Sequence, residues 1–304
     1  MGIQRHRALL DPQSPAWRVE NVEAFEPCWL ETYQYALLNP LSVVQADLAG
    51  LPCQPLKTRS IKVREHLLPQ LLCLNALPAA QRESLTAIVA EYTRRGTPFL
   101  SALLQSEATP DQIISHFRFT LEQPRSGSKR RWWLRCYDPR VFRHLCWLLD
   151  ELRMDRLLGP ITAWSWPDLS GCWHRLPRGG ELDPWKRMPM LSRQQWAAID
   201  RMALLNGTLD RLAMLAPEIR CSFEDYVWLD GLLAEAHERG LSDAEDCRLY
   251  AEQGARFHPH IHDHPGLRQR LNETIEQHGS YARYCEDLSP QLLQTMAREL
   301  EKTT

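Results

Sequence analysis

The feature that most constrains the fold is a change of pattern at a stretch rich in proline and glycine, from Pro167 to Pro189. Before this stretch, short apolar and aromatic runs suited to strands alternate with helical patterns. After it, only helical patterns occur. Strands mixed with helices and then helices alone are typical of the α+β class. We therefore expect an N-terminal mixed α/β lobe with a small sheet flanked by helices, followed by an all-α C-terminal lobe.

The same change of pattern predicts how the chain is divided. We expect an N-terminal arm over residues 1–20, an α+β domain over residues 21–176, a linker over residues 177–190 and a helical lobe over residues 191–304. A chain of 304 residues is long enough for one large domain or two modest ones.

Several helix starts are marked by a capping residue followed by proline or by a partner three residues later. These starts are Thr109-Pro110, Asp138-Pro139 and Ser289-Pro290, and the serine-led pairs Ser192 with Gln195, Ser222 with Asp225 and Ser242 with Glu245. The aromatic run from Trp29 to Leu38 instead predicts a strand, ended by Asn39-Pro40. Residues 119–123 and 131–137 flank a turn and predict a hairpin belonging to a sheet.

The overall composition excludes several classes of protein. The formal net charge is −2, so no global field attracts nucleic acid or an anionic membrane. The first twenty residues lack the apolar run of a signal peptide, and no segment has the roughly 20 apolar residues needed to cross a bilayer. The nine cysteines include no CxxC pair. We expect a cytoplasmic protein without a bound cofactor.

The sequence lacks the common catalytic motifs, and we therefore expect a protein that is not an enzyme. The sequence has no GxSxG elbow, no P-loop and no GxGxxG after a strand. Cys172 lies near His174 in the sequence, but neither has an identifiable third partner. Asp138 precedes Pro139, where a carboxylate accepts the free N–H groups of a helix's first turn. Helix capping therefore explains Asp138 better than acid catalysis does.

One pattern favours an alternative, a metal-dependent hydrolase. Four histidines alternate at His258, His260, His262 and His264. Alternate residues of an extended segment point the same way, so several imidazoles could converge on one metal ion. Two prolines indicate instead a surface loop with solvated histidines, and no HExxH pair supports a metal site.

A second alternative is a nucleic-acid-binding module. Basic residues between Arg125 and Arg143 interleave with Trp132, Trp133 and Tyr137, and single-stranded nucleic acid requires such cations and stacking surfaces. These cations fall at a hairpin tip and on the polar side of a helix, where solvation alone explains them.

The central stretch resembles a known bacterial family. Leu134-Arg-Cys-Tyr-Asp-Pro-Arg-Val-Phe, followed by Leu157-Leu-Gly-Pro-Ile-Thr-Ala-Trp164, is similar to the signature of the type VI secretion effector-chaperone (adaptor) family, long catalogued as a bacterial domain of unknown function. Tyr35-Ala-Leu-Leu-Asn-Pro is similar to the family's opening strand, although Asn39 stands where the family usually has Asp. The resemblance extends from about Trp29 to Trp173. Its motif residues are Tyr137, Asp138, Pro139, Arg140, Gly159 and Pro160.

The resemblance implies a non-catalytic cytosolic adaptor with two partners. Such proteins hold one cognate toxic effector and help to load it onto the secretion spike, the valine-glycine-repeat protein (VgrG). That work requires an exposed apolar or aromatic surface with a few desolvated anchors. We expect this surface to include Trp132, Trp133, Arg135, Trp164, Trp166 and Trp173, with Trp185 beside them. The opposing interpretation is that these tryptophans hold the two lobes together.

Overall fold

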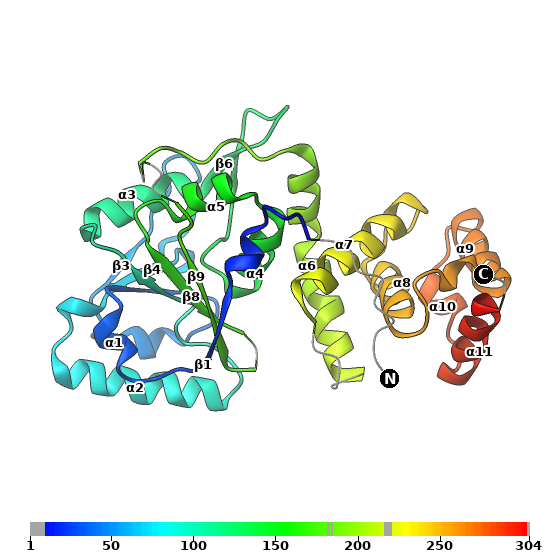
Figure 1. Cartoon of the computed structure of the whole chain (residues 1–304), viewed down its shortest axis with the longest axis horizontal. Helices are drawn as coiled ribbons and strands as arrows, with labels where there is room; N and C mark the ends of the chain where they lie inside the picture. The colour runs from blue at the N-terminus through cyan, green and yellow to red at the C-terminus, as the bar shows by residue number, and fades with distance from the viewer. Residues whose placement is uncertain (1–9, 169, 181–182, 184, 216–220, 303–304) are drawn as a thin grey trace. The chain divides into compact units, whose positions relative to one another are not determined.

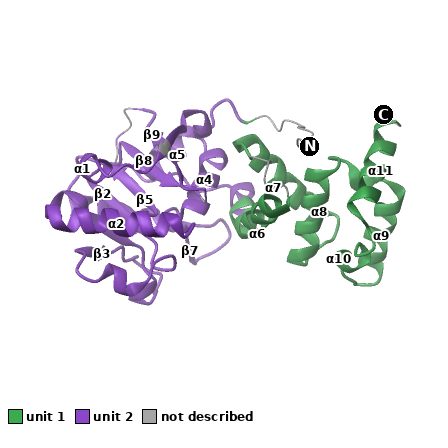
Figure 2. Ribbon diagram, turned by 90° about the horizontal axis from the view of Figure 1, so that it is seen from below, with its two compact units in different colours: residues 1–10, 197–304 green, residues 11–196 purple. Residues whose placement is uncertain are grey.

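The computed structural model describes residues 10–168, 170–180, 183, 185–215 and 221–302 (Figure 1). The first nine residues of the expected arm, and residues 181, 182 and 184 of the expected linker, lie outside these described residues. The chain forms two compact units, one of residues 11–196 and one that contains residues 197–304 (Figure 2). The boundary falls within helix α6, Arg193–Leu215.

The unit of residues 11–196 is built on an antiparallel sheet with the strand order β1-β9-β8-β5-β2-β4-β3. Its strands are β1 Glu20–Ala24, β2 Tyr35–Leu38, β3 Cys53–Pro55, β4 Gln70–Cys73, β5 Ala102–Gln105, β8 Ala163–Pro167 and β9 Cys172–Pro177. Its helices are α1 Trp29–Thr32, α2 Ala79–Arg94, α3 Pro110–Thr120, α4 Pro139–Leu148 and α5 Glu151–Leu158.

Helices cover both faces of this sheet. Figure 1 shows α2 on one side and α3 and α5 on the other. Leu85 and Val89 of α2 share one buried cluster with Leu103 of β5. On the other side, Phe142 of α4 stacks on Trp164 of β8 with ring centroids 4.4 Å apart and 5° between the planes. The expected mixed lobe, a sheet flanked by helices, is therefore confirmed.

Two segments of this unit differ from what their sequence pattern suggests, β8 and the residues before β2. All five residues of β8 are buried, the polar Ser165 included, because the strand lies between β9 and β5 and is covered on both faces. The strand expected from Trp29 to Leu38 is wrong in its first half. Residues Trp29–Thr32 form α1, where the Trp29 ring packs edge-on against Trp173 at 5.6 Å.

The expected hairpin forms, but it pairs only with itself among the described residues. Strand β6, Glu122–Pro124, is antiparallel to β7, Arg131–Trp133, with Gln123 opposite Trp132. The two strands make a separate two-stranded sheet.

The second unit contains only helices among its described residues, as expected for the C-terminal lobe. They are the rest of α6, then α7 Phe223–Glu238, α8 Ala244–Arg256, α9 Pro265–Glu276, α10 Tyr281–Tyr284 and α11 Pro290–Glu301, with a short 3₁₀ helix at Ile261–Asp263. None of the helices in the described part of the chain has both the length and the apolar composition for crossing a bilayer.

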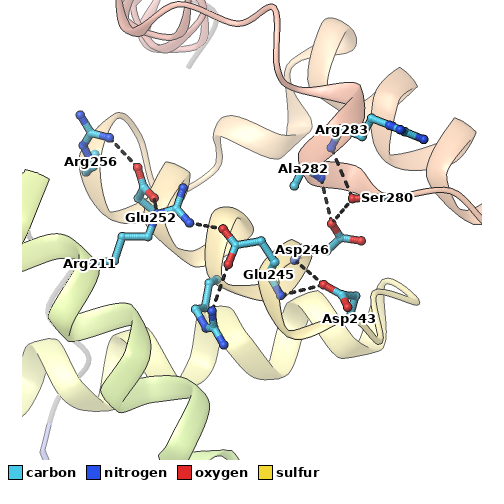
Figure 3. A network of polar contacts seen from close by, with 10 residues as sticks. Arg211, Asp243, Glu245, Asp246, Glu252, Arg256, Ser280, Ala282 and Arg283 are labelled. Carbon is cyan, nitrogen blue, oxygen red and sulfur yellow. Dashed lines mark hydrogen bonds and ion pairs between the residues drawn. The ribbon is translucent and has the colours of Figure 1, made fainter.

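A polar network centred on α8 joins these helices (Figure 3). The buried Glu252 forms ion pairs with Arg211 of α6 at 2.6 Å and with Arg256 at 2.5 Å. Asp246 accepts hydrogen bonds from Ser280 Oγ and from the Ala282 N–H, both at 2.9 Å. Since Glu252 binds a cation of α6 and Asp246 binds the start of α10, the network fixes where α6 and α10 meet α8.

The local helix starts follow the sequence closely. Thr109 and Ser222 form capping boxes with Gln112 and Asp225. The start expected at Ser242 is wrong by one residue, because the carboxylate of Asp243 caps α8 instead.

Candidate functional site

The Asp138-Pro139 motif begins α4. Asp138 Oδ1 accepts the Arg140 N–H at 3.0 Å, and Pro139 occupies the first turn, where no N–H is needed. The second carboxylate oxygen receives Arg135 Nη2 at 2.9 Å. Both oxygens of Asp138 are thus occupied by structural contacts. Tyr137 is buried, and burial raises the pKa of its hydroxyl.

Gly159 and Pro160 end α5 in a conformation that requires glycine. Gly159 has φ +56°, and a Cβ at this position would lie 2.3 Å from His116 Cε1. His116 Nε2 is 2.8 Å from the Leu157 carbonyl oxygen. The Pro160 carbonyl accepts the Ser106 hydroxyl at 2.7 Å. The Gly-Pro pair therefore holds the end of α5 against α3 and the loop after β5.

The structure separates the aromatic residues that were expected to form one partner surface. Trp164, Trp166 and Trp173 are buried in the unit of residues 11–196, at 0%, 1% and 4% exposure. Because they pack inside this unit, they offer no surface to a partner, and the expectation that they form part of one is wrong. Nor do they support the interpretation that they hold two lobes together. Their large apolar rings fill the space between the sheet and the helices that cover it.

The remaining aromatic candidates lie at the hairpin and beyond it. Trp132 is 41% exposed, Trp133 is partly buried and Trp185 is 53% exposed. The Arg125 guanidinium lies over the Trp132 ring, 4.9 Å from its centroid. The Arg135 side chain is exposed and lies over Tyr137.

The four histidines do not converge. The segment forms a 3₁₀ helix at Ile261–Asp263 in place of the extended strand that convergence requires. His262 is buried and stacks on Tyr250 with centroids 3.5 Å apart, whereas His264 caps α9 and has Nε2 2.9 Å from a carboxylate oxygen of Glu299. His258 Nδ1 accepts the N–H of His260. Among the described residues, no three His, Cys, Asp or Glu side chains are grouped as metal ligands would be.

A basic cavity lies on the side of the sheet that carries α3. Its volume is about 710 Å³, and the residues that line it include six cations: Arg59, Arg118, Arg131, Arg156, Lys186 and Arg187. Two of these guanidiniums contact the Phe119 ring, Arg187 at 4.3 Å and Arg59 at 5.0 Å from its centroid. Of these six cations, only Arg131 belongs to the basic stretch that the sequence pattern singles out.

One carboxylate, Glu122, also lines the cavity and is held by the backbone. It accepts the N–H groups of Ser60 at 2.6 Å and Ile61 at 3.0 Å, and the Ser60 hydroxyl at 2.7 Å. Burial raises the pKa of Glu122, but these hydrogen bonds outweigh burial and lower it overall. Glu122 therefore stays ionised and fixes the loop that carries Arg59.

His116 also lines the cavity but carries no charge at neutral pH. Burial lowers its pKa to about 4, although the hydrogen bond with Leu157 acts in the opposite direction. The positive charge of the cavity thus comes from arginine and lysine alone.

Part of the chain that lines the cavity matches a protein-family model. Residues 63–155 match the family model described as a domain of unknown function (DUF4123). No curated protein and no solved structure matches the chain.

The DUF4123 region is shorter than the stretch of resemblance seen in the sequence. It contains β4, α2, β5, α3, the hairpin and α4, and therefore Asp138-Pro139-Arg140, whereas Gly159-Pro160 lies just beyond it. Four cavity cations also lie outside the DUF4123 region: Arg59, Arg156, Lys186 and Arg187.

Proposed function

We propose that this chain is a cytoplasmic chaperone-adaptor, not an enzyme, which binds one cognate type VI secretion effector and helps to load it onto the VgrG spike. The observation that carries the proposal is the DUF4123 region at residues 63–155, with Asp138-Pro139-Arg140 inside it. The sequence around this motif resembles the effector-chaperone family. An adaptor acts before export, which is the reason for placing it in the cytoplasm.

Exposed tryptophans are the surface feature that supports a protein partner. Trp17, Trp132 and Trp185, all in the unit of residues 11–196, are exposed by 59%, 41% and 53%. Tryptophan and arginine are enriched among the residues that dominate binding energy in protein interfaces. Trp132 lies beneath the Arg125 guanidinium, so both residue types occur together at the hairpin.

The alternatives, a metal-dependent hydrolase and a nucleic-acid-binding module, gain no support. The histidines of residues 258–264 have separate partners, as described above. The guanidinium of Arg125 covers one face of the Trp132 ring, and Trp196 is buried, so the basic stretch presents no free row of stacking faces for successive bases.

Co-expression tests the proposal directly. The full chain, tagged, is produced together with the toxin encoded beside its gene and, separately, with the VgrG protein of the same cluster. We expect a stable complex with the toxin and reduced secretion of that toxin when the chain is deleted. Absence of a complex together with unchanged secretion contradicts the adaptor function.

A pair of variants locates the surface. Trp132→Ala is expected to weaken the complex at least tenfold, as truncation of a central aromatic anchor does. Leu152→Ala is the matched control, since Leu152 is 46% exposed on α5. Equal binding by both variants excludes the hairpin as the anchor without affecting the co-expression result.

A further inference from the structure

The basic cavity collects positive charge from parts of the chain that are far apart in the sequence. Arg59 lies in the loop after β3, Arg118 on α3 and Arg156 on α5, while Lys186 and Arg187 precede α6. A cavity of about 710 Å³ is within the usual range of ligand sites, roughly 300–1,000 Å³. The fold, not local sequence, therefore creates a concave surface on which six cations outnumber the single described carboxylate, that of Glu122.

Among the described residues, this positive charge has few counter-ions. None of the six cations forms an ion pair with a described residue. Arg156 donates a hydrogen bond to the Asp183 carbonyl, a neutral acceptor. Arg59 and Arg187 both lie within about 5 Å of the Phe119 centroid, which brings two like charges to one ring. A cleft lined by one sign of charge concentrates its field and attracts ligands of the opposite sign.

The arrangement of donors favours carboxylates over phosphates. Compact phosphate sites generally use helix N-termini and glycine-rich turns, where backbone N–H groups converge. Here Arg118 and Phe119 come from the last turns of α3 and Arg156 from the last turn of α5, where the helix ends present carbonyl groups and no free N–H groups. No glycine is among the described residues that line the cavity. Side-chain cations on separate elements suit separate carboxylates.

The same cavity also has apolar side chains, which suit a peptide ligand. Phe119, Trp185 and Met188 lie among the cations, so a bound chain has apolar contacts between its charged groups. We propose that this cavity binds an acidic peptide segment carried by a protein partner. The choice of a protein partner rests on the proposed function, whereas the preference for anions rests on the cavity alone.

The test measures peptide binding by the purified full chain at low salt. The probes are fluorescein-labelled hexaglutamate and hexaglutamine, followed by anisotropy, with tripolyphosphate and a single-stranded oligonucleotide as competitors. The variant Arg118→Glu/Arg187→Glu reverses two exposed cavity cations, and Arg118→Gln/Arg187→Gln removes the same charges without adding carboxylates. Arg268→Glu, on the exposed side of α9 in the other unit, is the control for charge change.

We expect hexaglutamate to bind, its affinity to fall with added salt and hexaglutamine not to bind. The charge-reversed variant should weaken hexaglutamate binding at least tenfold and the glutamine variant should weaken it less, whereas Arg268→Glu should leave it within twofold. Absence of hexaglutamate binding, or equal loss in Arg268→Glu, overturns the inference. Tighter binding of tripolyphosphate or of the oligonucleotide through the same two arginines also overturns it.

The two proposals fail separately. If the wild-type chain captures its toxin on co-expression but does not bind hexaglutamate, the cavity inference fails and the adaptor function stands. If hexaglutamate binds through Arg118 and Arg187 but no toxin or VgrG complex forms, the adaptor function fails and the preference of the cavity for acidic peptides stands.

Discussion

Gly159 lies so close to the imidazole of His116 that a Cβ at position 159 would be 2.3 Å from His116 Cε1. Gly159 also has φ +56°, a conformation that side chains rarely adopt. Gly159→Ala therefore combines backbone strain with a steric clash, and we expect a loss of about 2–4 kcal/mol in the free energy of unfolding. Urea denaturation followed by tryptophan fluorescence measures this loss, since ten of the eleven tryptophans lie in residues 11–196.

The matched control for this glycine is Gly127→Ala. Gly127 also has positive φ, +80°, but nothing lies within 4 Å of the added Cβ. Its cost should be limited to the backbone contribution of about 1 kcal/mol. Equal stability of the two variants would contradict a steric clash between a Cβ at position 159 and the His116 ring.

His116 should make stability depend on pH. Its native pKa is about 4, below the ordinary value of about 6.5, so the unfolded chain binds a proton that the folded chain does not between these values. Stability is therefore fully present above pH 6.5 and falls as the pH decreases toward 4. His116→Gln should flatten this slope by at most about 1.4 kcal/mol per pH unit. Urea denaturation at a series of pH values measures it.

The carboxylates supply an internal reference for that experiment. Hydrogen bonds lower the pKa of Glu122 and of Asp168 against the opposing effect of burial, so their stabilisation is lost as the pH falls through and below about 4, in the wild type and in the variant alike. Only the slope between pH 6.5 and 4 should differ. Identical slopes there would show that His116 is not held neutral by burial.

Trp164 should contribute to stability and not to a partner surface. It is fully buried and stacks on Phe142. Trp164→Ala should lower the free energy of unfolding by about 3–5 kcal/mol, the range for large aromatic truncations in a core. The exposed Trp132→Ala should cost about 1 kcal/mol or less. Unfolding followed by circular dichroism compares them, and a loss from Trp132→Ala as large as that from Trp164→Ala contradicts this assignment.

Asp138 should act as a helix cap. Asp138→Ala should destabilise the protein by about 0.5–2 kcal/mol, because the first turn of α4 loses its acceptor. Asp138→Ser should recover most of this loss, since a hydroxyl also accepts the N–H. Arg135→Ala removes an exposed ion pair with Asp138 and a contact with the Tyr137 ring, each worth about 1 kcal/mol or less. Thermal melting of the three variants distinguishes capping from ion pairing.

The sequence predicts features that depend on neighbouring residues. Thr109-Pro110 and Asp138-Pro139 mark helix starts because a cap acts on residues two or three positions away. The burial of Trp164 cannot be predicted from its own strand, because it depends on β5, β9 and Phe142 of α4, which only the fold brings to it. The cavity was missed because Arg59 and Arg187 meet only across the ring of Phe119, a contact that the folded sheet and helices create. No local pattern encodes such a contact.

The ion pair between Arg201 of α6 and Asp230 of α7 should stabilise the helical unit. Arg201 Nε and Nη2 donate to the two oxygens of Asp230 at 2.9 and 2.6 Å, and the Asp230 side chain is only 11% exposed. Asp230→Ala leaves a partly buried guanidinium without its acceptor, so we expect a loss of about 2–4 kcal/mol. Arg201→Lys keeps the charge but cannot form the bidentate contact, and should lose about half as much.

A double-mutant cycle measures the contribution of this ion pair separately from other effects of the two substitutions. The effects of Arg201→Ala and Asp230→Ala should differ from additivity by about 0.5–3 kcal/mol in thermal or urea unfolding, because each variant removes the same contact. Arg268→Ala, an exposed residue of α9 in the same unit, should combine additively with Asp230→Ala. Additive effects of Arg201→Ala and Asp230→Ala would show that α6 and α7 are held together by apolar packing, with no net contribution from this ion pair.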